Sequence, residues 1–138
     1  MRIRFCWACL VAALSLTACV GAPDDVAQLN AGSQLERASD HGLVDANVAL
    51  AGAALVRGPN DFEITLRAVG SDVAPVLTAV DASMAAHGHR ASAAGIARDG
   101  AAFRIEALDL FMSGRWQIAL GVEVDGRSDL VEFALDVP

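Results

Sequence analysis

The sequence predicts an all-β protein, a single antiparallel β-sandwich of about seven strands. Apolar and polar residues alternate with a period of two over several stretches, as they do in strands with one buried face. Dipeptides that favour tight turns separate these stretches at intervals of about ten residues. Within the predicted domain, no stretch has the periodicity of an amphipathic helix.

Residues 1–18 are expected to be a lipoprotein signal peptide. Arg2 and Arg4 make a basic start, and the apolar run that follows at residues 5–16 is too short for a comfortable membrane-spanning helix. The sequence LTAC at residues 16–19 resembles the bacterial lipobox, in which the cysteine becomes the lipidated first residue. We therefore expect Cys19 to carry lipid; an ordinary signal peptide containing a chance cysteine is the alternative.

Residues 19–46 are interpreted as a lipid-anchored flexible tether, because they are rich in Ala, Gly, Asp and Ser and show no sustained period. His41 lies in this segment, and no specific role is expected for it. The folded domain is expected at residues 47–138, which is enough chain for one hydrophobic core. With Cys6 and Cys9 lost with the signal peptide, the mature chain has no disulfide and relies on that core.

The strands differ in how clearly their alternation stands out. Clear alternation marks residues 62–68, 103–105, 115–124 and 131–137, and weaker, alanine-diluted alternation marks residues 48–56, 76–81 and 91–97. Gly58-Pro59-Asn60 is expected to separate the first two strands. Asp99-Gly100 and Asp125-Gly126 are expected to form hairpin turns, because aspartate and glycine tolerate positive φ.

Counting strands places two connections at the same end of the sandwich. If each strand crosses the sandwich once, successive connections alternate between its two ends, so the two Asp-Gly turns share one end. The connection that contains Met84, His87 and His89 then lies at the other end, together with the connection at residues 108–114, which contains Met112.

Two methionines and two histidines at one end favour copper, above all Cu(I), because thioether sulfur is a soft ligand and imidazole a borderline one. His87 and His89 are two residues apart and point the same way if the backbone is extended, and Gly88 allows a close approach. No thiolate or carboxylate cluster accompanies them, which argues against a structural zinc or hard-cation site. Met84, His87, His89 and Met112 are therefore the candidate copper ligands.

A second interpretation is an interaction module that binds no metal. Met112 could fill the end of the core, the histidines could be solvated loop residues, and Trp116 is expected to anchor the core. An enzyme is not expected, because the mature chain has no thiol nucleophile and neither Ser83 nor Ser92 lies in a Gly-x-Ser-x-Gly motif.

The two segments that carry these ligands resemble those of the YtkA-like and FixH-like family of bacterial envelope domains. In that family a strand ends in a Met-Pro-x-His-Gly-His segment, and a later Met-x-Gly-x-Trp segment opens the penultimate strand. Here residues 84–89 read MAAHGH and residues 112–116 read MSGRW, with Ala85 where proline is usual. The resemblance covers residues 43–138. It implies an immunoglobulin-like sandwich and a role in copper handling or oxidase assembly, with a copper-accepting envelope protein or an oxidase assembly factor as partner.

The charge and the expected lipid bear on partners and location. Loss of Arg2 and Arg4 leaves 8 arginines against 17 acidic residues, a net charge of −9, so nucleic acid is not an expected partner. The lipid on Cys19 makes the membrane a partner and places the chain in the cell envelope, facing the periplasm. Val20 stands where a retention aspartate would follow the cysteine, which favours the outer membrane in a Gram-negative host.

Overall fold

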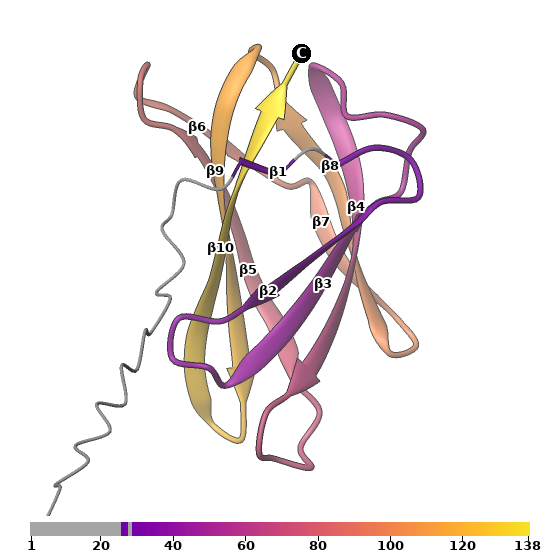
Figure 1. Ribbon diagram of the computed structural model, residues 1–138, viewed down its shortest axis with the longest axis vertical. Coiled ribbons are helices and arrows are strands. Elements are labelled where there is room, and N and C mark those ends of the chain that lie inside the picture. The colour runs from indigo at the N-terminus through magenta and orange to yellow at the C-terminus, as the bar shows by residue number, and fades with distance from the viewer. Residues whose placement is uncertain (1–25, 28) are drawn as a thin grey trace, which may run out of the picture.

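The computed structural model describes residues 26–27 and 29–138, and these form two five-stranded sheets packed face to face (Figure 1). One sheet has the strand order β1-β10-β9-β5-β6 and the other β2-β3-β4-β8-β7. The strands are β1 (Val26–Ala27), β2 (Gln34–Ala38), β3 (Val44–Leu50), β4 (Gly58–Ala68), β5 (Val76–Met84), β6 (His89–Ser92), β7 (Gly95–Asp99), β8 (Ala102–Leu110), β9 (Gly114–Val124) and β10 (Arg127–Val137). The predicted β-sandwich is therefore confirmed. The described residues contain no helix long and apolar enough to cross a membrane.

The strand order is that of an immunoglobulin-like Greek key. Strands β3-β4-β8-β7 correspond to the A-B-E-D sheet of that fold, and β10-β9-β5-β6 to its G-F-C-C′ sheet. All pairings among these eight strands are antiparallel. Two further strands extend the sheets: β2 pairs antiparallel with β3, and β1 pairs parallel with β10.

The core lies between the sheets and is built by the predicted alternation. The inward residues of β9 are all buried, from Trp116 at 0% exposed to Val124 at 5%. Phe62, Ile64 and Leu66 of β4 face them across the sandwich and are also buried. Burying each large apolar side chain stabilises the fold by roughly 1.5–3 kcal/mol. No cysteine lies among the described residues, so this core contains no disulfide.

The folded domain begins earlier than the sequence indicated. Strand β2 and the first part of β3 lie within residues 19–46, and Val44 and Ala46 are 0% and 2% exposed. Strand β1 and the core residue Leu29 also lie in this segment, so the flexible tether is a wrong prediction for its described residues, 26–27 and 29–46. Alanine weakens the apolar alternation in β3, and β2 is an edge strand without a buried residue. Neither strand is therefore evident from the pattern of apolar residues. Cys19 and the predicted signal peptide lie outside the described residues.

The strand expected at residues 91–97 is in fact two strands in different sheets. Strand β6 ends at Ser92 and pairs with β5, and β7 begins at Gly95 and pairs with β8. The chain crosses from one sheet to the other at Ala93 and Ala94. This crossing leaves β6 only four residues long.

The two Asp-Gly turns are confirmed, and the Gly-Pro-Asn boundary is not. Asp125 and Gly126 have φ of 51° and 70°, and Gly100 has φ of 60°, the left-handed values that such hairpin turns require. Gly58, in contrast, already belongs to β4. The irregularity at that point is a bulge in the pairing of β4 with β8, between Asn60 and Phe62.

Candidate functional site

The β5–β6 hairpin presents the two histidines. Met84 and His89 are register partners at the ends of the two strands, and the backbone N–H of His87 donates to the carbonyl oxygen of Met84 across 3.1 Å. Gly88 has φ of 66°, which glycine adopts without strain. His87 therefore lies in a turn, and the extended backbone expected for both histidines holds only for His89. Their rings still lie side by side, with centroids 6.2 Å apart and planes 29° apart.

Met84 lies under this turn, inside the core. It is 2% exposed, and its Cε would lie 3.5 Å from a Cβ placed on Gly114. Methionine fills irregular gaps of this kind because its side chain is unbranched and flexible. This position suits a packing residue better than an accessible metal ligand.

The β8–β9 connection carries the second methionine. Met112 is partly buried and packs against the edge of the core. Two hydrogen bonds hold this connection: the indole N–H of Trp116 donates to the carbonyl oxygen of Met112 across 2.9 Å, and the Ser113 hydroxyl donates to the carbonyl oxygen of Pro138 across 2.8 Å. Trp116 is itself 0% exposed, as expected for a core anchor.

Aromatic contacts join the two loops. The ring of His89 meets Phe111 at a centroid distance of 5.4 Å and an angle of 72°, and Phe111 meets Trp116 at 5.4 Å and 76°. The hairpin and the β8–β9 connection therefore lie at the same end of the sandwich, as strand counting predicted (Figure 1). We call this the site end, defined by His87, His89, Phe111 and Met112.

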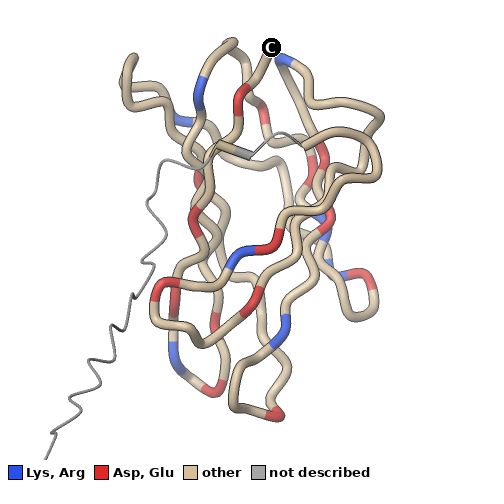
Figure 2. Tube along the Cα trace, in the orientation of Figure 1, with Lys and Arg blue, Asp and Glu red and all other residues tan. Residues whose placement is uncertain are grey.

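The side chains at the site end that could donate to a metal are the imidazoles of His87 and His89 and the thioether of Met112. Residues 82–89 contain no Asp, Glu, Lys or Arg, and the tip of the hairpin is uncharged in Figure 2. The charges that flank this hairpin are those of Asp81 and of Arg90, which directly follows His89, and their side chains pair across 3.1 Å. In the β8–β9 connection, Asp109 and Arg115 are each three residues from Met112. Among the described residues, no three His, Cys, Asp or Glu side chains are grouped to hold a metal ion. Any ion bound by His87 and His89 thus needs a thioether or an outside group to complete its coordination.

A buried carboxylate that the sequence analysis did not identify lies near the other end. The side chain of Asp129 is 1% exposed, and its oxygens accept the backbone N–H groups of His41, Leu43 and Leu130 at 2.9–3.3 Å. The His41 Nδ1 lies 2.9 Å from Asp129 Oδ1. Burial acts to raise the pKa of Asp129, but hydrogen bonds from Ser39, His41 and the backbone outweigh it and hold that pKa well below its usual value.

This cluster fastens the β2–β3 turn to β10 and gives His41 a definite partner, contrary to expectation. A signal for it exists in the sequence. Asp129 occupies an inward position in the alternation of β10, where Val131 and Phe133 follow it, while its neighbour Leu130 is 45% exposed. An acid at an inward strand position predicts a buried, hydrogen-bonded carboxylate.

Comparisons with family models, with curated proteins and with solved structures found no match. The resemblance to the YtkA-like and FixH-like family therefore rests on residues 84–89 and 112–116.

Proposed function

We propose that this chain is a lipid-anchored cell-envelope domain that binds copper, as Cu(I), at the site end. The proposed ligands are His87, His89 and Met112. The observation that carries the proposal is the contact of His89 with Phe111, because it brings the paired imidazoles against the connection that holds a partly buried thioether. Two imidazoles and one thioether suit Cu(I), which accepts low coordination numbers and soft neutral ligands.

Met84 takes a different part in this proposal from the one the sequence suggested. Because it is 2% exposed and in contact with the core, we assign it to packing beneath the hairpin. A copper-accepting envelope protein or an oxidase assembly factor is the proposed partner, in keeping with the resemblance to the YtkA-like and FixH-like family. We propose a binding role and no catalysis. The lipid on Cys19 is proposed to hold the chain at the membrane, the outer membrane in a Gram-negative host.

Competitive titration with a colorimetric Cu(I) chelator tests the metal site. The mature chain with Cys19→Ser is compared with a variant that adds His87→Ala, His89→Ala and Met112→Leu. We expect the Cu(I) affinity to fall by more than about tenfold, since loss of ligands costs at least as much as loss of their supporting partners. The matched control is His41→Ala, which removes the histidine beside Asp129 and leaves the affinity unchanged. Retention of full affinity in the triple variant rejects the copper site.

One observation favours an interaction module as the second candidate. Phe111 is 41% exposed beside His89, and an exposed aromatic side chain at the tip of a sandwich is a feature of protein-binding loops. Two results together would assign this function instead. The chain would bind neither Cu(I) nor Ag(I), and the substitution Phe111→Ser would abolish its binding of a protein partner from membrane extracts.

A further inference from the structure

The early start of the fold leaves a short link to the proposed lipid. Strand β1 begins at Val26, so only residues 20–25 separate it from Cys19. A fully extended chain advances at most about 3.3–3.6 Å per residue, so this link reaches about 25 Å. The inference that follows rests on the lipidation of Cys19 given under the proposed function. If that cysteine carries lipid, the domain lies close to the bilayer.

The pairing of β1 sets the direction in which this link leaves the fold. Val26 is the partner of Ala134, and β1 runs parallel to β10. Strand β10 begins at Arg127, seven residues before Ala134, and Cys19 precedes Val26 by the same number. At Val26 the described chain is therefore directed toward the end that holds the β9–β10 turn, opposite to His87 and His89.

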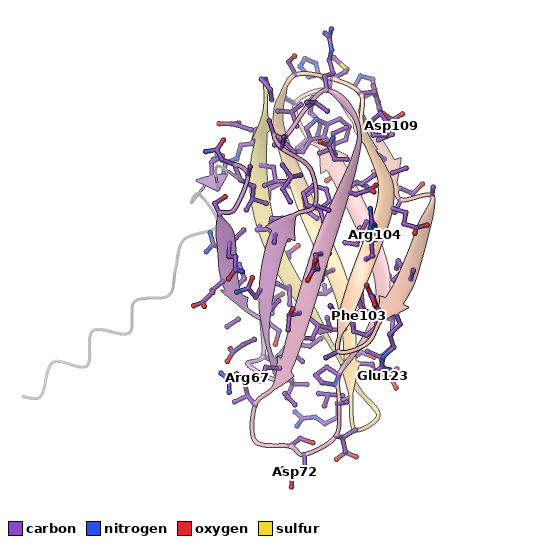
Figure 3. All side chains as sticks on the ribbon, turned by 90° about the vertical axis from the view of Figure 1, so that its right-hand side faces the viewer. Arg67, Asp72, Phe103, Arg104, Asp109 and Glu123 are labelled. Atoms are coloured by element: carbon purple, nitrogen blue, oxygen red, sulfur yellow. The ribbon has the colours of Figure 1, made fainter. Side chains whose placement is uncertain are left out.

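Three exposed valines lie at that opposite end. Val69, Val73 and Val76 are 44%, 47% and 42% exposed, three of the seven large hydrophobic side chains that are exposed among the described residues. All three belong to the β4–β5 connection or its border, and Val76 pairs with Glu123 next to the β9–β10 turn. We call this surface the valine end. Figure 3 shows Asp72 at its tip, whereas Asp109 lies toward the site end.

We propose that the valine end rests on the bilayer surface and so directs the site end away from the membrane. The exposed valines lie at the level of the lipid headgroups, and the acidic Asp72 and Asp125 limit how deeply they enter. Three half-exposed valines bury too little area to hold a protein on lipid, so the contact depends on the anchor. In this orientation His87 and His89 are open to a soluble partner.

Fluorescent labelling of the lipidated chain in vesicles of phosphatidylethanolamine and phosphatidylglycerol tests the orientation. With Cys19 acylated, the mature chain has no free thiol, so Val73→Cys and Val56→Cys each accept a single environment-sensitive label. Val56 is a matched control, because it is 48% exposed and lies near Gly58, which pairs with Leu110 at the site end. We expect a blue shift and protection from iodide quenching at position 73 and neither at position 56.

The outcomes separate the orientation from the anchor. The orientation is overturned if the chain binds vesicles but the label is protected at position 56 alone, at both positions or at neither. Each of these results leaves the lipid anchor unaffected. If the chain does not float with vesicles, both the lipid anchor and this inference are wrong. The metal site is tested separately by the Cu(I) titration. Hydrogen exchange on the unsubstituted chain is a second readout: residues 69–73 should exchange more slowly on vesicles, and unchanged exchange there contradicts the proposal.

Discussion

The indole N–H of Trp116 donates a hydrogen bond to the carbonyl oxygen of Met112 across 2.9 Å. Trp116 is completely buried, whereas Met112 lies at the edge of the core. The same indole also meets the ring of Phe111, which in turn contacts His89. One core residue thus supports both loops of the site end. The position of the proposed ligand Met112 is fixed by its hydrogen bond to this residue.

Replacing Trp116 by phenylalanine should weaken both the fold and the site. The change leaves the carbonyl oxygen of Met112 without its donor and opens a small cavity, which together cost about 2–3 kcal/mol in the free energy of unfolding. Because Met112 is then held less firmly, the Cu(I) affinity should also fall, though less than on loss of the thioether. Urea unfolding and competitive titration measure the two effects.

The control for this variant is Phe103→Leu, a core substitution in β8 beside Ala102, at the valine end of that strand. Phe103 is 4% exposed, so this change also costs stability, but it should leave the Cu(I) affinity intact. Equal losses of affinity in both variants would mean that Trp116 acts through overall stability and has no positioning role.

Asp129→Asn should destabilise the fold by about 2–4 kcal/mol at neutral pH. An amide cannot accept all the N–H groups that converge on the carboxylate, and its own NH₂ faces donors. The folded state lowers the pKa of Asp129, so its stabilisation is present above the ordinary value near 4 and is lost as the pH falls below that value. The wild-type free energy of unfolding should therefore drop between about pH 5 and pH 2, with a shallower slope in the variant.

Asp125→Asn provides the comparison for this effect. Asp125 is exposed in the β9–β10 turn with φ of 51°, a conformation that asparagine also tolerates. Its replacement should leave the neutral-pH stability and the acid slope close to those of the wild type. Identical acid slopes in the wild type and Asp129→Asn would exclude the carboxylate as the source.

The sequence was sufficient to predict the fold where alternation used large side chains. Strands β4, β9 and β10 and the turns at Gly100 and Gly126 were found because their apolar period and turn chemistry agree. Strand β2 was missed because an edge strand without a buried residue carries no period. The sheet-to-sheet crossing at Ala93 and Ala94 was missed because two consecutive alanines fit either sheet.

At the site, strand counting predicted which loops meet but not which atoms are accessible. Both connections could be assigned to one end, and the contact between His89 and Phe111 confirms that assignment. Burial of Met84 depends on its inward position as the last residue of β5, and the strand expected at residues 76–81 ended before it. The role of Asp129 depends on the β2–β3 turn, which contains His41 and lies where the sequence shows no sustained period.

Gly121→Ala should cost about 1–3 kcal/mol in the free energy of unfolding. A Cβ at this position would lie 3.0 Å from the Thr78 hydroxyl oxygen and 3.1 Å from the Ala79 Cβ, at the bulge where the pairing of β5 with β9 shifts register. Gly52→Ala is the matched change, because the closest atom to its Cβ is 3.9 Å away and its φ is not in the left-handed region. Thermal unfolding should distinguish the two, and an unaffected Gly121→Ala would show that β5 moves freely at the bulge.

Two methionine-to-leucine changes separate packing from binding. Leucine nearly conserves the volume of methionine, so Met84→Leu and Met112→Leu should each cost less than about 1.5 kcal/mol and keep the fold. A ligand that binds only the folded state raises the melting temperature, so Ag(I), a redox-stable substitute for Cu(I), should stabilise the wild type. Met84→Leu should retain this rise because Met84 is only 2% exposed and is packed in the core, while Met112→Leu should lose most of it. The reverse result, with the rise lost only in Met84→Leu, would make the buried sulfur the ligand and would require the hairpin to open when metal binds.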